Sequence, residues 1–319
     1  MKSRPLGRAG LDIAPLVLGG NVFGWTTDEQ TSFAILDSFA EAGFNAIDTA
    51  DVYSAWAPGH KGGESETIIG KWLKASGKRG QMIIITKVGS DMGEGRKGLG
   101  ARYIEEAAEA SLRRLGIDTI DLYLSHWPDP ATPYEETLGA YRRLLQKGKV
   151  RAVGASNLDA AQMRDALAVS ARLGLPRYDV LQPEYNLYDR AGFEGALQDL
   201  CIAESIGVVT YFGLAKGFLT GKYRGVADLA KSPRGGGVGS YLNPRGMRIL
   251  DALDAVAERS NAQPAEVALA WLMAKPGVTA PIASATSVSQ LQSLVRAANL
   301  ELTAADIALL DRAASPELV

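Results

Sequence analysis

Cysteine and histidine are scarce in this sequence of 319 residues, and each shortage excludes a class of protein. The one cysteine, Cys201, cannot form an intrachain disulfide, which suits a reducing compartment. The two histidines, His60 and His126, lie far apart, and no Cys-x-x-Cys or His-x-His pair is present to build a zinc or iron site. We therefore expect no metal site and no metal-dependent hydrolase.

Long apolar runs and an excess of charge of one sign are also missing. No uninterrupted apolar stretch approaches about 18 residues, the length of a membrane-spanning helix. The N-terminal MKSRPLGRAG has no apolar core of a signal peptide. The formal net charge of −2 argues against nucleic acid or an anionic membrane as a partner. We expect a cytoplasmic protein that binds a small molecule, as a monomer or a homo-oligomer.

The composition, 46% hydrophobic and 22% charged, is that of a globular domain in which apolar runs recur in a regular order. Eight strand-like runs alternate with helical patterns, several of which end on glycine. The runs are 13–20, 45–50, 82–89, 119–127, 151–156, 180–186, 207–214 and 278–285. Eight alternations predict one domain over residues 1–319 with a (β/α)8 TIM-barrel fold, and an open doubly wound sheet is the alternative.

Two segments fall outside this repeating pattern. RPLGRAGLDIAPL, residues 4–16, places Gly-Arg-Ala-Gly between two short runs, which predicts a small hairpin that plugs the bottom of the barrel. Residues 215–246 form a long, glycine-rich and basic loop after the seventh strand, and a loop of this length more often has a function than serves as a spacer.

Two apparent phosphate-binding motifs depart from the patterns that such motifs require. GEGRKG at 93–98 matches a dinucleotide fingerprint, but it leads into a polar turn instead of an apolar helix. GFLTGKY at 217–223 has Tyr223 where a Walker A motif requires Ser or Thr. We therefore expect neither a Rossmann nor a P-loop nucleotide site.

Polar side chains stand at the carboxyl ends of the expected strands, where barrel enzymes place their active sites. Asp48 ends the second strand, Lys87 the third and His126 the fourth. Tyr53 follows the second strand closely. Each alone has an ordinary explanation, such as a helix cap, a surface lysine or a core histidine. Together, an acid, a cation, a phenol and an imidazole at one barrel mouth are typical of proton transfer.

The chemistry of these side chains assigns each a role. A free tyrosine has a pKa of about 10, too high for efficient acid–base work at neutral pH, and a nearby ammonium lowers it. We expect Lys87 to lower the pKa of Tyr53 and Asp48 to keep Lys87 charged. His126 would donate a hydrogen bond to a bound oxygen. Such a site protonates a carbonyl or deprotonates an alcohol, and because no residue supplies a hydride, a nicotinamide cofactor is implied.

Six motifs occur along the chain in the order GFNAIDTADVYS, IITKVG, IDLYLSHWPDP, LLQKGKVRAVGASN, LQPEYNLYDR and GLAKGFLTGKY. With these motifs, the sequence resembles the aldo-keto reductase family over essentially the whole chain. The resemblance implies a (β/α)8 fold and the NAD(P)H-dependent reduction of aldehydes and ketones, without a metal or a Rossmann motif. It also implies that the catalytic residues are Asp48, Tyr53, Lys87 and His126, with Tyr53 as the general acid.

The resemblance further implies a cofactor site at the same mouth. The nicotinamide carboxamide would lie on residues that follow strands five and six, and its ring would stack on Tyr211. The loop after strand seven would hold the pyrophosphate, with Lys222 and Arg234 as counter-charges. The full set is Gly20, Asn21, Asp48, Ser156, Asn157, Gln182, Tyr211, Gly213, Leu214, Ala215, Gly217, Lys222, Arg234, Ser284, Thr286 and Gln290.

Departures from the family pattern leave the choice of cofactor open. Phe212 and Gly213 stand where the family commonly has Ser-Pro, and Ser293 and Leu294 replace a Glu-Asn pair that touches the adenine. ASATSVSQLQSL, around the last strand, also lacks the basic residue that often binds the adenosine 2′-phosphate. An arginine side chain binds a phosphate group much better than a hydroxyl side chain does. We expect NADP first, with NAD as the alternative.

The expected substrate is a carbonyl compound or the corresponding alcohol. The residues expected to wall its pocket are Val22, Trp25, Tyr53, Trp56, His126 and Trp127. Their aromatic character favours an apolar, aromatic or cyclic compound. Two other interpretations stay open: an alcohol or sugar dehydrogenase that runs the same chemistry in reverse, and a cofactor-sensing regulatory subunit that resembles the potassium-channel β subunits. The chain begins close to its first strand, so we expect no N-terminal extension that would act on a channel.

Overall fold

The computed structural model describes residues 3–231 and 235–316, and its centre is a closed barrel of eight parallel strands. In barrel order they are β10 (Ala280–Ala283), β3 (Val17–Gly19), β4 (Ala46–Asp48), β5 (Ile83–Val88), β6 (Ile120–Ser125), β7 (Val150–Ser156), β8 (Val180–Gln182) and β9 (Gly207–Thr210). β10 pairs with both β3 and β9, which closes the ring. The eight predicted strands and the (β/α)8 fold are confirmed, and the open sheet is excluded.

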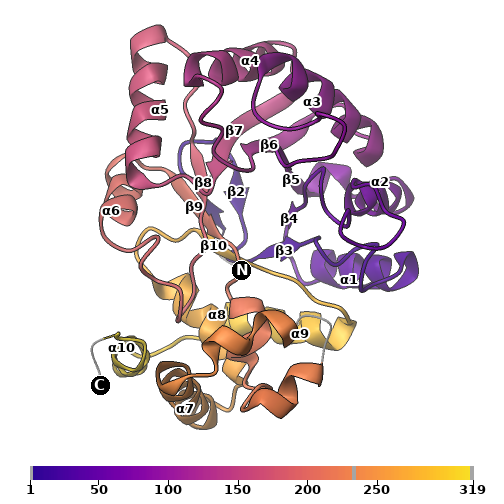
Figure 1. Ribbon diagram of the computed structural model, residues 1–319. Coiled ribbons are helices and arrows are strands. Elements are labelled where there is room, and N and C mark those ends of the chain that lie inside the picture. The colour runs from indigo at the N-terminus through magenta and orange to yellow at the C-terminus, as the bar shows by residue number, and fades with distance from the viewer. Residues whose placement is uncertain (1–2, 232–234, 317–319) are drawn as a thin grey trace.

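Helices surround the barrel and cover its outer face (Figure 1). They are α1 (Glu29–Glu41), α2 (Glu64–Ser76), α3 (Ala101–Leu115), α4 (Tyr134–Gln146), α5 (Ala160–Leu173), α6 (Ala196–Ala203), α7 (Pro244–Ser260), α8 (Pro264–Ala274), α9 (Val288–Asn299) and α10 (Ala304–Ala313). α1 to α6 follow β3 to β8 one by one, whereas α7 and α8 both lie between β9 and β10. α7 packs against α10, and Arg259 pairs with Asp306 at 2.6 Å across that contact. Within the described residues, no helix has the length and apolar character needed to cross a bilayer.

The bounds of the helices follow from capping residues at their ends. The side chains of Asp159 and Thr303 accept backbone N–H groups in the first turns of α5 and α10. Gly77 and Gly116 end α2 and α3 with a left-handed backbone that glycine adopts without strain. The strands are buried on both faces, which is why they appear in the sequence as continuous apolar runs.

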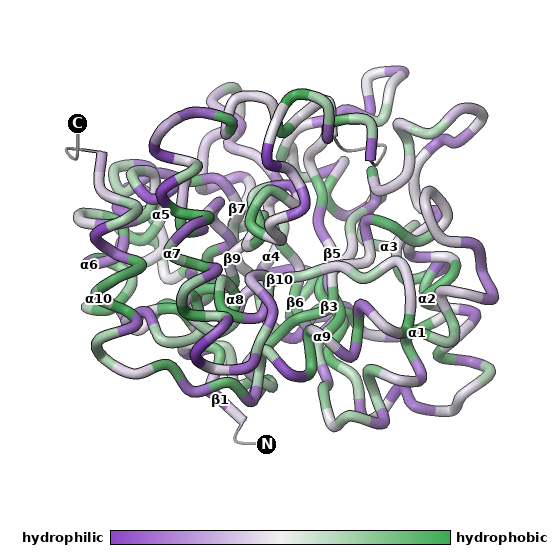
Figure 2. The backbone as a smooth tube through the Cα atoms, turned by 90° about the horizontal axis from the view of Figure 1, so that it is seen from below, coloured by the Kyte–Doolittle hydropathy of each residue, from purple (hydrophilic) through white to green (hydrophobic). Residues whose placement is uncertain are grey.

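A short antiparallel hairpin closes one end of the barrel, as predicted. Its strands are β1 (Arg4–Pro5) and β2 (Asp12–Ile13), and Figure 2 shows β1 and the N-terminus together at this end. Leu6 and Leu11 are buried in the same apolar cluster as the inward-facing strand residues. Gly7 has φ +56°, and a Cβ there would lie 2.2 Å from the backbone nitrogen of Gly207, at the start of β9. Because this hairpin blocks the N-terminal ends of the strands, the open mouth lies at their C-terminal ends.

The long loop after β9 ends before the predicted boundary at residue 246, because α7 begins at Pro244. It contains four 3-10 helices, η2 (Ala215–Thr220), η3 (Val226–Lys231), η4 (Gly235–Gly237) and η5 (Gly239–Tyr241). α7 already begins at Pro244, because Asn243 caps it by accepting from Gly246 N at 3.0 Å and proline suits the first helical position.

Candidate active site

Three neighbouring strands bring the predicted catalytic side chains together at the mouth of the barrel. Asp48 is the last residue of β4, Lys87 lies near the end of β5, and His126 directly follows β6. Tyr53 lies in the turn after β4, where its N–H donates to Ala50 O at 3.2 Å. Because β4, β5 and β6 are adjacent in the barrel, residues far apart in the sequence meet at one point.

Lys87 is the centre of this group and has no exposed surface. Its Nζ donates to Asp48 Oδ2, to Thr49 O and to Tyr53 OH, each at 2.8 Å. Burial lowers the pKa of Lys87, and the Asp48 carboxylate opposes that shift. All three ammonium protons have acceptors and one acceptor is ionised, so we infer that Lys87 stays charged.

Tyr53 lies between the ion pair and the mouth. Its hydroxyl accepts from Lys87 and donates to Asp48 Oδ2 at 3.3 Å. Burial raises the pKa of Tyr53 well above its ordinary value, and the charge of Asp48 raises it further. The pKa of Tyr53 is therefore raised and not lowered as expected, because burial disfavours a phenolate and the Asp48 charge adds to that effect. Tyr53 keeps its proton at neutral pH.

His126 faces Tyr53 across the mouth, with ring centroids 6.0 Å apart. Burial lowers the pKa of His126 well below its ordinary value, and the charge of Lys87 adds to the shift. The imidazole is therefore neutral at pH 7. Its Nδ1 lies 3.0 Å from Ser90 Oγ, and Trp127 stacks beside the ring at 5.8 Å. Ser90 was not predicted, although its place three residues after Lys87, just beyond β5, is a sequence clue.

The residues predicted to hold the nicotinamide form one hydrogen-bonded group. Ser156 Oγ donates to Gln182 O at 2.7 Å, and Tyr211 OH donates to Asn157 Oδ1 at 2.7 Å. The side chain of Gln182 also donates to Asp48 Oδ1 at 2.8 Å. This last bond links the group to the catalytic ion pair, since Asp48 uses one oxygen for Gln182 and the other for Lys87.

The predicted residues after β3 and β10 line the same end of the barrel. Gly20 N donates to Asp48 O at 2.7 Å, and a Cβ at Gly20 would lie only 2.9 Å from Ser65 Oγ. Ser284 Oγ donates to Asn21 Oδ1 at 2.6 Å, which joins the ends of β10 and β3. Glycine at position 20 is thus required by the close approach of β4 and α2.

The backbone after β9 turns through several left-handed residues. They are Phe212, Ala215, Lys216 and Gly217. Ala215 N donates to Phe212 O at 2.7 Å, but within the described residues the N–H groups of Gly213 and Leu214 have no protein acceptor. Successive N–H groups around left-handed turns form concave sites that favour an anion. Lys222 is exposed beside Gly217, whereas Arg234 lies outside the described residues.

The segment before α9 has hydroxyl and amide groups in place of a cation. Gln290 Oε1 accepts from both the N–H and the hydroxyl of Thr286, at 2.9 and 3.1 Å. Both side chains are exposed. Arg296 is turned away to Glu266, with its Nε 2.9 Å from Glu266 Oε1, and Ser293 donates to the same oxygen. This segment therefore offers hydrogen bonds but no free guanidinium.

Aromatic side chains surround the mouth beside Tyr53. Trp25 and Trp56 meet edge to face at 5.5 Å, and Trp56 lies 6.0 Å from Tyr53 in the same manner. Trp56 and Trp127 are exposed by 48% and 49%, a large amount for tryptophan. Val22, also predicted to wall the pocket, is instead 1% exposed within the main core.

A buried carboxyl that was not predicted lies next to this site. Asp51 is 2% exposed, its N–H donates to Lys87 O at 3.3 Å, and neither carboxylate oxygen has a partner in the described part of the chain. Burial, followed by the charge of Glu66, raises the pKa of Asp51 to about 7. Glu66 itself is satisfied by Thr86 and Arg114, each at 2.6 Å. Asp51 is thus the one member of this buried cluster that the described structure leaves without a counter-charge in contact.

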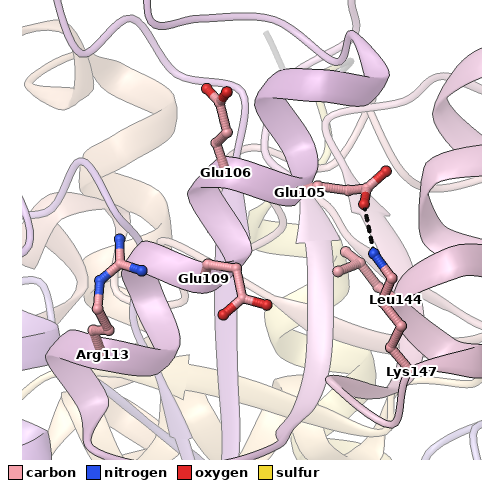
Figure 3. A pocket seen from close by; sticks show the side chains of 6 residues that line it. All are labelled: Glu105, Glu106, Glu109, Arg113, Leu144 and Lys147. Carbon is pink, nitrogen blue, oxygen red and sulfur yellow. Dashed lines mark hydrogen bonds and ion pairs between the residues drawn. The ribbon is translucent and has the colours of Figure 1, made fainter.

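A hollow lies on the outside of the barrel, between α3 and α4 (Figure 3). Its lining residues are Glu105, Glu106, Glu109, Arg113, Leu144 and Lys147. Glu105 already pairs with Lys147 at 3.0 Å, and no residue of the strand-end mouth contributes to this hollow.

Over residues 3–231 and 235–316, no group of three or more His, Cys, Asp or Glu side chains is arranged to bind a metal. The strand-end mouth is therefore the candidate active site.

Sequence comparison with known proteins gives matches that cover nearly the whole chain. The profile described as "Aldo/keto reductase family" matches residues 15–315. A "Probable voltage-gated potassium channel subunit beta" from Arabidopsis thaliana is 32% identical over 310 residues, which cover 94% of this chain and 92% of that protein. "Aldo-keto reductase YhdN" from Bacillus subtilis (strain 168) is 34% identical over 284 residues, 87% of this chain and 81% of that protein. "Aldo-keto reductase str7" from Strobilurus tenacellus is 32% identical over 308 residues, 95% and 86% of the two chains.

Proposed function

Because the chain belongs to the aldo/keto reductase family, we propose that it is an NAD(P)H-dependent oxidoreductase that reduces an aldehyde or a ketone to an alcohol. The observation that carries this proposal is the buried ion pair of Lys87 and Asp48 in direct contact with the Tyr53 hydroxyl, with His126 opposite. Such a group can deliver a proton to an oxygen but cannot deliver a hydride. The bound nicotinamide would supply the hydride.

The residues present fit such a cofactor. The N–H groups of Gly213 and Leu214, which have no acceptor among the described residues and lie at left-handed turns, would suit a pyrophosphate, and Lys222 would add a positive charge. Asn157 and Gln182 would hold the carboxamide, and the ring of Tyr211 would support the nicotinamide. These assignments use groups that already lie at the mouth beside the catalytic residues.

Each catalytic residue has a distinct task in carbonyl reduction. Tyr53 retains its proton at neutral pH and would donate it to the substrate oxygen as negative charge develops there. Lys87 lies 2.8 Å from the Tyr53 oxygen and would stabilise the phenolate left behind. Asp48 fixes Lys87 in place, and His126 would orient the substrate oxygen. The same residues would accept a proton from an alcohol in the reverse direction, so an alcohol or sugar dehydrogenase is the closest alternative.

We propose NADP as the preferred cofactor, with NAD as a contender. Thr286 and Gln290 could bond either a 2′-hydroxyl or a 2′-phosphate, and Lys222 is an exposed cation in the loop after β9. Titration of the protein with NADPH and with NADH, followed by the quenching of tryptophan fluorescence, decides the matter. Tighter binding of NADPH supports the reductase assignment, comparable binding of NADH favours a dehydrogenase, and binding of neither refutes the cofactor site.

We further propose an apolar aromatic or cyclic carbonyl substrate, since Trp25, Trp56 and Trp127 surround the reacting group. The functional test is the rate of NADPH oxidation with a panel of such aldehydes and ketones. Tyr53→Phe should abolish turnover and leave NADPH affinity nearly unchanged, because only the transferable proton is lost. Tyr178→Phe is the matched control, since it removes a buried hydroxyl that is bonded to Ser125. Retained turnover in Tyr53→Phe would contradict the general-acid assignment.

A second candidate function comes from the relative named as a potassium-channel β subunit. In that case this chain would bind the cofactor and act as a regulatory subunit on another protein. Slow turnover with very slow release of the oxidised cofactor would favour this function. Rapid release and turnover of a carbonyl substrate would favour the enzyme.

A further inference from the structure

The His126 ring has one hydrogen-bond partner within the described residues, the hydroxyl of Ser90. Oγ lies 3.0 Å from Nδ1, and the two residues are 8% and 9% exposed. Two arrangements satisfy this distance: the hydroxyl donates to a bare Nδ1, or an Nδ1–H donates to the oxygen. They leave the other ring nitrogen, Nε2, in opposite protonation states.

The proton of the Ser90 hydroxyl distinguishes the two arrangements. Over residues 3–231 and 235–316, this proton has no acceptor other than His126 Nδ1. If Nδ1 carried a hydrogen, the hydroxyl proton would stay buried without an acceptor, which is unfavourable. If Ser90 donates, both buried groups are satisfied by the one bond. Only the arrangement with a bare Nδ1 therefore satisfies both the hydroxyl and the imidazole.

The surroundings of the ring keep it neutral, since burial and the charge of Lys87 lower the pKa of His126. A neutral imidazole has one hydrogen, and with Nδ1 bare that hydrogen lies on Nε2. Nε2 has no protein partner in the described part of the chain, and the ring faces Tyr53 across the mouth. An N–H there would point at the same oxygen that Tyr53 protonates.

We propose that Ser90 is a positioning residue that fixes the Nε2–H tautomer of His126 and thereby provides the substrate oxygen with its second hydrogen-bond donor. Other contacts fix the position of the ring but do not determine which of its nitrogens carries the proton. Asn157 Nδ2 donates to His126 O at 2.9 Å, and Trp127 lies nearly parallel to the ring, at 12°. The consequence for turnover rests on the proposed reductase function, whereas the tautomer does not.

The tautomer can be observed directly because the protein has only two histidines. Long-range 1H–15N correlation spectra of 15N-histidine-labelled protein, at pH 7 and without cofactor, distinguish a protonated from a bare ring nitrogen. His60→Gln assigns the remaining imidazole to His126. We expect a protonated Nε2 and a bare Nδ1 in the wild-type protein. A protonated Nδ1, or rapid exchange between both forms, would overturn the proposal.

Three serine variants separate tautomer control from structural support. Ser90→Ala should give a mixture of tautomers and lower kcat/KM about twofold, because only about half of the protein then has a donor at Nε2. Ser90→Thr keeps the hydroxyl and should restore both the spectrum and the rate. Ser125→Ala is the matched control: it removes a buried hydroxyl adjacent in sequence to His126 that bonds Tyr141 and Tyr178. It should leave the His126 spectrum and kcat/KM unchanged.

The outcomes also separate this inference from the proposed function. An unchanged His126 spectrum in Ser90→Ala would overturn the role of Ser90, whatever the rate. An Nε2–H spectrum that depends on Ser90, in a protein that reduces no carbonyl compound, would uphold the tautomer assignment and reject the reductase function.

Discussion

Replacing Asp51 by asparagine should change how the stability of this protein depends on pH. The Asp51 carboxyl is buried without a hydrogen-bond partner in the described part of the chain, and burial raises its pKa from 3.8 to about 7. Between these values the folded state binds a proton more tightly than the unfolded state does. The stability contributed by protonated Asp51 is therefore complete below about pH 4 and is lost as the pH rises through 7.

The size of this loss follows from the pKa. Each pH unit between the two values is worth about 1.4 kcal/mol, so ionising Asp51 costs about 4 kcal/mol in total by pH 7. About 2 kcal/mol of that cost falls between pH 5 and pH 7. An asparagine side chain cannot ionise and has nearly the same shape as that of aspartate. The free energy of unfolding of Asp51→Asn, relative to wild type, should thus rise by about 2 kcal/mol over this interval.

Urea denaturation followed by tryptophan fluorescence, at several pH values from 5 to 8, measures this difference. Comparing variant with wild type at each pH cancels contributions from His126 and from all other shared groups. Asp251→Asn, at an exposed position on α7, is the control and should change the difference little, because exposed charges contribute little. A difference that stays flat across the interval would refute the reasoning, since it would mean that Asp51 is already ionised in the folded protein at pH 5.

The remaining predictions concern the ion pair and the barrel plug. Lys87→Met should lower kcat for carbonyl reduction at least about 100-fold and destabilise the protein by about 3–5 kcal/mol, because Asp48 is left buried and unpaired. Adding Asp48→Asn to this variant should recover the stability but not the turnover. Recovery of both the stability and the turnover would show that Lys87 is only structural. Gly7→Ala should cost about 2–4 kcal/mol in urea denaturation, since its Cβ would meet Gly207 N at 2.2 Å. Gly10→Ala, also left-handed but with nothing within 4 Å, should cost only about 1 kcal/mol, and equal losses would argue against a tight plug.

The barrel and its hairpin could be predicted because their causes are local in the sequence. Strands buried on both faces produce unbroken apolar runs, and glycine at helix ends marks where each helix stops. The rule that barrel sites lie at strand ends then selected Asp48, Lys87 and His126 without any coordinates. The end of the loop after β9 was placed too late, at residue 246, because the Asn243 cap that starts α7 lies within the glycine-rich segment.

What could not be predicted depends on burial, which no single position in the sequence reveals. The pKa of Tyr53 rises because the hydroxyl is enclosed and the charge of Asp48 adds to the shift. Asp51 resembles any other polar residue in a turn, and only the packing around it leaves its carboxyl without a partner among the described residues. Val22 was placed on the pocket wall, but its side chain turns into the core. Ser90 is a generic loop serine until the histidine ring is seen beside it.

The hairpin that plugs the bottom of the barrel has a consequence for how the chain folds during its synthesis. Its turn at Gly7 lies against Gly207 and the carbonyl of Asp179, and Arg4 donates to the carbonyls of Met273 and Thr279. The hairpin is synthesised before every barrel strand, yet it finds its place only after nearly the last strand has been made. Contacts of such long sequence separation form slowly. Until then the apolar side chains of the hairpin stay exposed, so this hairpin needs protection from aggregation during synthesis.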